Sequence, residues 1–300
     1  MGKLDGKVAI VTGSGRGIGR AEALALAAEG AKVVINDLGG AIDGTGASRS
    51  PAEEVVQEIK KLGGDAVANY DSVASLAGGE NIIKTAIDKF GKLDILVNNA
   101  GVTRDRFIFN MAEDEWDTVI KIHLYGHFYC TRLACTYFRQ QRSGRIINTA
   151  SAAGLGNMGQ ANYSAAKEGI IGFTRTVARD MAKYGVTCNA IRPIAATRLT
   201  ISPELKASWE KTGMYDVIKK IESATPEMIA PFVVFLCTDV AANINGYDFA
   251  VGGGQIGVYS QPVVLSQINE PGRVWTVDEL LDILPKKITG NLAAPASVQA

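Results

Sequence analysis

The chain has no excess of charge of either sign. Lysine and arginine together number 31, and aspartate and glutamate also number 31, so the formal net charge is zero. Proteins that bind nucleic acids or anionic membranes through electrostatics carry a clear basic surplus. The balance therefore argues against nucleic-acid and membrane partners.

Long hydrophobic runs are absent as well. No apolar stretch reaches the roughly 20 residues that a membrane-spanning helix needs. Residues 1–6 lead directly into the short apolar run at residues 8–11, without the pattern of a secretory signal. We therefore expect a cytoplasmic protein.

Cysteine and histidine are both scarce. The four cysteines form no C-x-x-C pair, which favours small buried hydrophobic side chains in a reducing compartment over a disulfide framework. The two histidines lie four residues apart on a predicted helix, but the sequence supplies neither the glutamate of H-E-x-x-H nor a third ligand, so we predict no metal site. No G-x-S-x-G motif is present, which argues against a serine hydrolase. These residues are Cys130, Cys135, Cys188, Cys237, His123 and His127.

Short apolar runs alternate with helical patterns over the first 250 of the 300 residues. Continuous apolar runs are typical of parallel strands, because both faces of such a sheet are covered. Strands are predicted at residues 8–11, 32–35, 66–69, 93–97, 145–148, 187–191 and 247–251, and helices at 21–29, 53–62, 82–90, 116–140, 163–184 and 229–237. This order predicts an α/β fold: a single doubly wound, Rossmann-type, seven-stranded parallel sheet with helices on both faces.

Two segments extend this simple plan. Residues 38–48 form a long, glycine-rich polar loop, and loops of this length are usually functional or disordered. Thr276 and Glu279 form a capping-box signature, which predicts one short helix in the tail. We expect one Rossmann-type domain at residues 1–255, with a lid segment at about 197–224, and a C-terminal extension at 256–300.

A glycine-rich sequence, T-G-S-G-R-G-I-G at residues 12–19, joins the first strand to the first helix. Glycine lets the main chain approach a phosphate, and the helix N-terminus offers unpaired N–H groups. Asp37 ends the second strand, where an acidic residue accepts hydrogen bonds from an adenosine ribose and repels a 2′-phosphate. Arg16 could attract that phosphate, but no basic residue closely follows Asp37. The sequence therefore predicts NAD rather than NADP.

Tyr163 and Lys167 lie four residues apart, so they share one face of a predicted helix. Ser151 follows the fifth strand, at the edge of the sheet where ligands bind in this architecture. The Lys167 charge and a positively charged nicotinamide would lower the pKa of Tyr163 toward neutrality. Such a tyrosine can exchange a proton with a substrate hydroxyl or carbonyl group.

With these residues the sequence resembles the short-chain dehydrogenase/reductase family over roughly residues 5–255. Within that family it is similar to the (3R)-hydroxyacyl-CoA dehydrogenase domain of peroxisomal multifunctional enzyme type 2 and its free-standing bacterial relatives. The motifs that match, in the family's order and spacing, are residues 12–19, Asp37, Asp71, residues 98–101, Ser151, Tyr163 and Lys167.

The resemblance implies a role for each matching residue. Tyr163 would be the catalytic acid and base, Lys167 would lower its pKa and bind the nicotinamide ribose, and Ser151 would position the substrate oxygen. The expected cofactor-binding set, which also includes Tyr163 and Lys167, is Gly13, Arg16, Gly17, Ile18, Gly19, Asp37, Asp71, Ser72, Asn99, Ala100, Gly101 and Pro193.

Three positions depart from the usual family pattern. His123 stands where the family usually has an asparagine in its proton relay. The multifunctional-enzyme subgroup also resembles this chain in having a histidine at this position, so we include His123 among the catalytic residues. Pro193 is followed by isoleucine instead of glycine, and the Ser151–Tyr163 spacing is one residue shorter than in that subgroup.

These expectations define an NAD-dependent oxidoreductase that interconverts a secondary alcohol and a ketone, with (3R)-3-hydroxyacyl-CoA as the leading substrate. Three alternatives stay open: a hydroxysteroid or other bulky-alcohol dehydrogenase, a 3-oxoacyl-thioester reductase, and a non-catalytic dinucleotide sensor. From the family we also expect a homodimer or homotetramer that pairs through its long helices.

Overall fold

The computed structural model describes residues 2–197, 219, 222–290 and 292. Its central feature is an eight-stranded sheet in the order β3-β2-β1-β4-β5-β6-β7-β8. The strands are β1 (Val8–Thr12), β2 (Lys32–Asn36), β3 (Ala66–Asn69), β4 (Ile95–Asn98), β5 (Gly144–Thr149), β6 (Val186–Pro193), β7 (Asp248–Gly252) and β8 (Gln255–Val258).

The first seven strands are parallel and correspond to the seven predicted runs, so the doubly wound parallel sheet is confirmed. The eighth strand was not predicted. It pairs antiparallel with β7 and all four of its residues are exposed. β8 is only four residues long, and its two apolar residues, Ile256 and Val258, alternate with glutamine and glycine, so the segment contains no continuous apolar run that would predict a strand.

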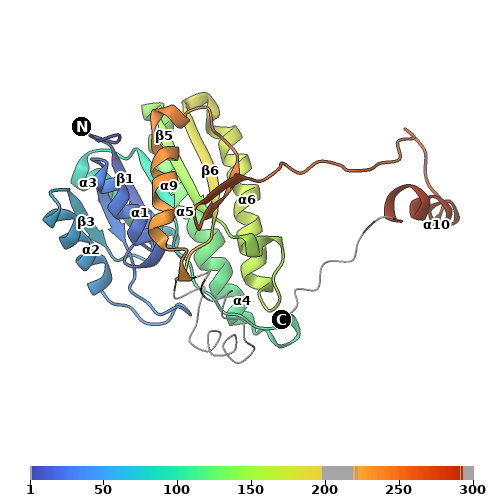
Figure 1. Cartoon of the computed structure of the whole chain (residues 1–300), viewed down its shortest axis with the longest axis horizontal. Coiled ribbons are helices and arrows are strands. Elements are labelled where there is room, and N and C mark those ends of the chain that lie inside the picture. Colours follow the sequence, from blue (N-terminus) through green and yellow to red (C-terminus); the bar gives the residue numbers. More distant parts are fainter. Residues whose placement is uncertain (1, 198–218, 220–221, 291, 293–300) are drawn as a thin grey trace. The chain divides into compact units, whose positions relative to one another are not determined.

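Helices cover both faces of the sheet (Figure 1). Alternate residues of each strand point to opposite faces, so Ala9 and Val11 pack with α1, α2 and α9, whereas Val8 and Ile10 pack with α3, α5 and α6. The described helices are α1 (Gly17–Ala28), α2 (Ser50–Lys61), α3 (Leu76–Phe90), α4 (Glu113–Ile120), α5 (Gly126–Gln141), α6 (Ala161–Met181), α9 (Ala230–Cys237) and α10 (Val277–Leu284).

The helix predicted at residues 116–140 is interrupted in the structure. A π-helical turn, η2 (Lys121–Tyr125), separates α4 from α5. Such turns are frequent at functional sites, because the extra residue in the turn shifts the side chains along the helix. Here the turn contains His123.

The chain divides into two compact units, Met1–Tyr259 and Ser260–Ala300. In the second unit, Thr276 caps α10, and its hydroxyl accepts a hydrogen bond from the Glu279 N–H at 3.3 Å. Most of the predicted lid lies outside the described residues. None of the described helices is long and apolar enough to cross a membrane, and all four cysteines are free.

Candidate active site

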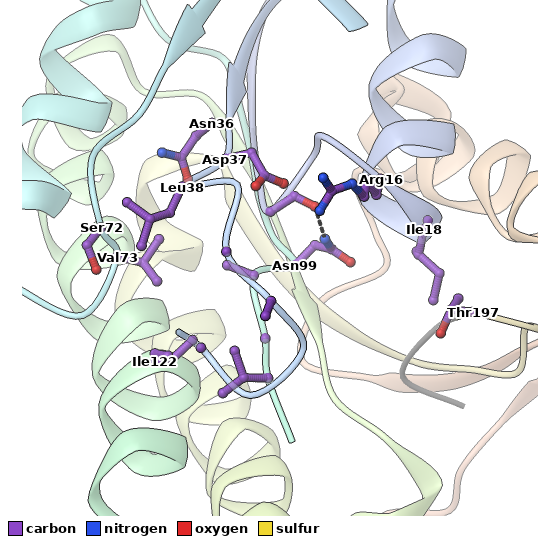
Figure 2. Close-up of a pocket in the computed structure, with 18 of the residues that line it drawn as sticks. Arg16, Ile18, Asn36, Asp37, Leu38, Ser72, Val73, Asn99, Ile122 and Thr197 are labelled. Atoms are coloured by element: carbon purple, nitrogen blue, oxygen red, sulfur yellow. Dashed lines mark hydrogen bonds between the residues drawn. The ribbon is translucent and has the colours of Figure 1, made fainter. Parts of the chain in front are cut away.

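A pocket of about 330 Å³ opens at the carboxyl ends of β1, β2 and β4 (Figure 2). Most of the predicted cofactor-binding residues line it, together with residues from the loop after β2. The lining consists of Gly13, Arg16, Gly17, Ile18, Asn36, Asp37, Leu38, Gly40, Ala41, Gly44, Asp71, Ser72, Val73, Asn99, Ala100, Gly101, Val102, Ile122 and Thr197. Of the other predicted residues, Gly19 lies beneath Asn99, and Pro193 ends β6 beside Val251.

The glycine-rich loop needs glycine for two separate reasons. Gly13 and Gly17 have φ angles of 63° and 56°, a left-handed conformation that other residues rarely adopt. A Cβ on Gly19 would lie 2.4 Å from Asn99 Nδ2, and one on Gly13 would lie 2.7 Å from Ala100 Cα. The backbone of this loop is therefore packed closely against the end of β4.

The first turn of α1 is available to an anion. Its N-cap residue is Arg16, whose guanidinium group has only donors, so no side-chain acceptor at this position caps the helix. The unpaired N–H groups of the helix start and its positive dipole end favour a phosphate at this point. The loop therefore fits the pyrophosphate of a dinucleotide.

Asp37 lies in the pocket wall and is held by two main-chain groups. Its Oδ2 accepts a hydrogen bond from the Gly15 N–H at 2.7 Å, and its Oδ1 accepts one from the Gly39 N–H at 2.6 Å. A carboxylate oxygen accepts more than one hydrogen bond. Asp37 therefore keeps acceptor capacity for ribose hydroxyl groups.

Asp71 is fixed by a small amide network at the ends of β2 and β3. Its side chain accepts hydrogen bonds from Asn69 Nδ2 at 2.8 Å and Asn81 Nδ2 at 3.0 Å, and its main-chain carbonyl accepts one from Asn36 Nδ2 at 2.9 Å. These bonds hold the segment that presents Asp71 and Ser72 to the pocket.

Residues 38–48, here called the strap loop, form one wall of the pocket. Their N-terminal and C-terminal ends meet where the Ser48 N–H donates to the Leu38 carbonyl at 2.9 Å. The middle of the loop reaches the segment after β4: the Thr103 N–H donates to the Ile42 carbonyl at 3.0 Å, and Arg104 Nε donates to the Asp43 carbonyl at 2.8 Å. The long loop therefore has a defined structure.

Ser151, Tyr163 and Lys167 lie on two adjacent segments. Ser151 follows β5 and caps the short 3₁₀ turn η3 (Ala152–Leu155), where its Oγ accepts a hydrogen bond from the Ala153 N–H at 3.2 Å. Tyr163 and Lys167 lie on α6, with Lys167 Nζ 5.4 Å from the centroid of the Tyr163 ring. Lys167 Nζ also donates to the Thr149 carbonyl at 2.6 Å.

The pKa of Tyr163 differs from the sequence-based expectation. Burial raises the pKa of Tyr163 to about 12, and a hydrogen bond with Ser151 opposes this only in part. Burial also lowers the pKa of Lys167 to about 7, which weakens its positive charge at neutral pH. The protein's own residues therefore keep the phenol protonated and do not lower its pKa toward neutrality.

His123 packs edge-on against the Tyr163 ring, with a centroid distance of 5.2 Å. Its Nε2 lies 3.0 Å from Val102 N and 2.8 Å from Val102 O. A Cβ on Gly101 would lie 2.4 Å from the His123 ring, so this position has room only for glycine.

Both histidines are neutral at physiological pH. Burial, followed by the charge of Lys167, lowers the pKa of His123 well below its ordinary value and that of His127 to about 3. Among the described residues no group of three or more His, Cys, Asp or Glu side chains could hold a metal ion.

The pocket, the glycine-rich loop and the Ser151, Tyr163 and Lys167 group all lie within the range of one family model. The model described as short chain dehydrogenase matches residues 7–204. The chain belongs to this family. Short-chain dehydrogenases act as oxidoreductases on CH–OH groups of small molecules and typically bind a nicotinamide dinucleotide.

Individual short-chain dehydrogenases support a closer comparison. The chain is 40% identical over 301 residues to the hydroxyacyl-CoA dehydrogenase ChsB1 of Mycobacterium tuberculosis, covering 96% of this chain and 90% of that one. It is 45% identical over 258 residues to peroxisomal multifunctional enzyme type 2 of Mus musculus, covering 85% of this chain but only 33% of that enzyme. The resemblance to this subgroup is therefore confirmed.

Two further short-chain dehydrogenases extend the comparison. A 3-oxoacyl-[acyl-carrier-protein] reductase of Synechocystis sp. is 44% identical over 258 residues, covering 85% of this chain and 99% of that one. A crystal structure of a short chain dehydrogenase from Mycobacterium avium superposes with a TM-score of 0.83 at 44% identity and covers 98% of both chains. The family is thus clear, whereas the named relatives differ in substrate.

Sequence reasoning assigned no role to two residues that support this short-chain dehydrogenase site. The Thr12 hydroxyl accepts hydrogen bonds from the N–H groups of Asn99 and Ala100, at 3.0 and 3.1 Å. Asn162 is fully buried, and its Oδ1 accepts from the Tyr163 N–H at 2.7 Å while its Nδ2 donates to the Arg104 carbonyl at 2.9 Å. Thr12 begins the glycine-rich sequence at residues 12–19 and Asn162 directly precedes Tyr163, but no pattern in the sequence assigns a role to either side chain.

Proposed function

We propose that the protein is an NAD-dependent dehydrogenase that interconverts (3R)-3-hydroxyacyl-CoA and 3-oxoacyl-CoA. The observation that carries the proposal is the course of the pocket. It runs from Asp37 to Gly101, and Gly101 packs against His123, whose ring contacts Tyr163. A dinucleotide in this pocket would have its adenosine at Asp37 and its nicotinamide toward Tyr163.

Asp37 supports NAD as the cofactor. A carboxylate in the pocket wall repels the 2′-phosphate that distinguishes NADP from NAD. Arg16 also lines the pocket, but both Asp37 oxygens are fixed by main-chain N–H groups, which orient the carboxylate. We therefore assign the discrimination between the two cofactors to Asp37.

The chain's own residues supply a proton donor and two groups that orient it. Tyr163 is protonated at neutral pH, so it donates its proton to the oxygen of a ketone in reduction. In alcohol oxidation the phenolate form takes the proton, and the positive charge of an oxidised nicotinamide would favour that form. Ser151 donates a hydrogen bond to the same oxygen, and Lys167 lies beside the Tyr163 ring. The dinucleotide, when bound, would supply the hydride as NADH in reduction and accept it as NAD+ in oxidation.

Exposed apolar side chains near Ser151 and Tyr163 support a substrate with a long or bulky apolar part. Phe107 and Phe109 stack with ring centroids 5.6 Å apart, and both are exposed. Their loop is joined to the segment before Tyr163, because the Arg106 N–H donates to the Gly159 carbonyl at 2.7 Å. Leu155 and Met158 of that neighbouring segment are exposed too.

Two other substrate classes remain candidates. A hydroxysteroid or other bulky alcohol would also fit an apolar rim, and a relative is named as a 3-oxoacyl-[acyl-carrier-protein] reductase. Asp37 argues against the second class, because biosynthetic reductases generally use NADPH. A sensor without turnover would not need the Ser151, Tyr163 and Lys167 group.

The test is NADH oxidation by the purified protein with acetoacetyl-CoA, run beside NADPH and a bulky free ketone. We expect fast turnover with NADH and the thioester. Turnover of the free ketone alone would move the substrate to an alcohol or steroid, and preference for NADPH would contradict the role of Asp37. An Asp37→Ser variant, which removes the carboxylate, should narrow the difference in kcat/KM between NADH and NADPH.

We also propose that the protein is a homodimer or homotetramer. Trp116, Tyr125 and Phe128 are exposed along α4, η2 and α5, and apolar patches on long helices favour protein–protein contacts. Light scattering of the purified chain should give a mass of two or four copies. A monomer at micromolar concentration would contradict this proposal.

A further inference from the structure

Arg192 is a buried arginine that contacts three separate parts of the catalytic region. It lies on β6 and is only 2% exposed. Its Nη1 donates to the Ser151 carbonyl at 2.9 Å, its Nε to Asp248 Oδ2 at 2.8 Å, and its Nη2 to Glu168 Oε2 at 3.0 Å. The loop after β5, strand β7 and helix α6 therefore meet at one guanidinium group.

The Ser151 contact lies one residue beyond the main-chain pairing of β5 with β6. The pairing of β5 with β6 extends to the Ala150 N–H, which donates to the Ile191 carbonyl at 2.8 Å. The next donor on β6 would be residue 193, and this is a proline without an N–H. The Arg192 side chain is thus the group of β6 that holds the chain at Ser151.

The same guanidinium also bonds to the helix that carries the other catalytic residues. Glu168 directly follows Lys167 on α6, one turn after Tyr163. Gly154 leaves room for this arrangement, because a Cβ there would lie 2.9 Å from Glu168 Oε2 and 3.2 Å from Arg192 Nη1. A planar group with fixed donors therefore links Ser151 to the helix of Tyr163.

The surroundings of Arg192 keep this group rigid. Asp248 is 1% exposed and supplies the opposite charge, while Arg175 lies 3.5 Å from the other oxygen of Asp248. The ring of Tyr259 covers the guanidinium at 4.8 Å from its centroid. A buried, paired and covered guanidinium has little freedom to move.

We propose that Arg192 is a positioning residue that sets the placement of Ser151 relative to Tyr163. The proposal rests on the proposed function, because it assumes that Ser151 and Tyr163 act on the same substrate oxygen. Arg192 itself does not line the pocket. Its effect should therefore appear in turnover and not in dinucleotide binding.

Arg145 provides a matched control at the opposite end of the sheet. It is 7% exposed, donates to the carbonyl groups of Gly144 and Gly185 at 3.0 and 3.3 Å, and pairs with Asp239 at 3.3 Å. It thus resembles Arg192 in burial and bonding but lies at the amino end of β5, far from Ser151. Arg145→Lys should lower the melting temperature and leave kcat within twofold.

The decisive experiment is a double-mutant cycle of Arg192→Lys with Ser151→Ala, which measures kcat and the KM for NADH with the ketone that the wild-type protein reduces. We expect Arg192→Lys to lower kcat about tenfold, since small misplacements of reacting groups have effects of this order. The KM for NADH should stay within twofold. In the Ser151→Ala background, Arg192→Lys should lower kcat less than twofold, because the Ser151 hydroxyl group that Arg192 positions has been removed.

Equal losses in both backgrounds would overturn the proposal, since Arg192 would then act through the fold and not through Ser151. An unchanged kcat for Arg192→Lys would overturn it as well. If Ser151→Ala keeps full turnover, the catalytic role of Ser151 fails and the proposal fails with it. Glu168→Gln, which weakens one partner of the guanidinium, serves as a second and milder variant and should show a smaller kcat loss that also disappears without Ser151.

Discussion

Tyr163 lies where burial and a hydrogen bond with Ser151 act in opposite directions on the pKa of its hydroxyl group, and burial has the larger effect. Burial raises its pKa to about 12, so the group is a proton donor at every physiological pH. Removing the hydroxyl should therefore remove the proton transfer and leave the pocket intact, because Tyr163 is not among the residues that line it. For Tyr163→Phe we expect kcat to fall by about 10²–10⁴-fold and the Kd for NADH, measured by fluorescence, to stay within twofold.

Tyr184→Phe is the matched control for that variant. Tyr184 lies in η4 (Ala182–Tyr184) after the far end of α6, under the guanidinium of Arg142. Its loss should leave kcat unchanged. Turnover by Tyr163→Phe at the wild-type rate would contradict the assigned role of the phenol.

Glu22 is a second residue whose environment predicts a measurable effect. It lies on α1, is fully buried, and neither carboxylate oxygen has a hydrogen-bond partner among the described residues. Burial raises the pKa of Glu22 from 4.5 to about 8. Between these two values the folded state holds a proton that the unfolded state has lost, so this group makes the protein less stable as pH rises from about 4.5 to 8.

Glu22→Gln removes the ionisable group and keeps the shape of the side chain. We expect the variant to melt at a higher temperature than the wild type at pH 8. The increase should be about 2–4 °C for each 1 kcal/mol by which the substitution raises the free energy of unfolding, and the difference should shrink toward pH 5. Asp65→Asn, at a half-exposed ion pair with Lys32, is the control and should show no such trend. A constant difference across this pH range would mean that Glu22 is charged in the folded protein.

At the scale of single residues, motif spacing was sufficient to find the glycine loop, Asp37 and the Ser151, Tyr163 and Lys167 group. It could not find Arg192 or Glu22, because the importance of both residues comes from burial between elements that are distant in sequence. The direction in which the pKa of Tyr163 shifts could not be predicted from the sequence either. Proximity to Lys167 was predictable, but the effect of burial on both groups was not.

At the scale of elements, the strap loop offers a test of how the pocket wall is held. Arg104 joins this loop to the segment after β4, since its Nε donates to the Asp43 carbonyl and its Nη1 pairs with Asp114 at 3.2 Å. Arg104→Ala should loosen the wall and weaken NADH binding about fivefold, the effect of one hydrogen bond of about 1 kcal/mol. Stopped-flow fluorescence should show the change mainly as faster NADH release.

Arg106 is the control for this variant, because its side chain pairs with Glu115 and makes no contact with the strap loop that the structure records. Arg106→Ala should leave NADH release within twofold of the wild type. If both variants release NADH at the wild-type rate, the wall does not depend on the Arg104 contact.

The elements also show where prediction from periodicity ends. Seven strands were recognisable because their buried runs are apolar on both faces, as parallel strands require. The strand β8 and the π-helical turn at His123 were not recognisable. The four residues of β8 contain only two apolar side chains and no continuous apolar run, and one extra residue in a turn alters the helical repeat too little to be seen in residues 116–140.

At the scale of the whole molecule, the pocket and the groups around Tyr163 all belong to the unit Met1–Tyr259. A chain that ends at Tyr259 should therefore fold, bind NADH with the Kd of the full chain and keep its kcat. A chain that ends at Gly254 should differ, because it lacks β8 and Tyr259. The Tyr259 N–H donates to the Asp248 carbonyl at 2.9 Å, and its ring covers Arg192.

Comparison of the two truncated chains tests whether β8 and Tyr259 contribute to turnover through Arg192, the residue that contacts Ser151. For the chain that ends at Gly254 we expect a lower melting temperature and a kcat reduced several-fold, since a cation–π contact contributes about 0.5–2 kcal/mol, with the Kd for NADH unchanged. Circular dichroism, NADH titration and initial rates measure the three quantities. If the chain that ends at Tyr259 loses NADH binding, then residues beyond it contribute to the dinucleotide site, and the site is not contained in the first unit.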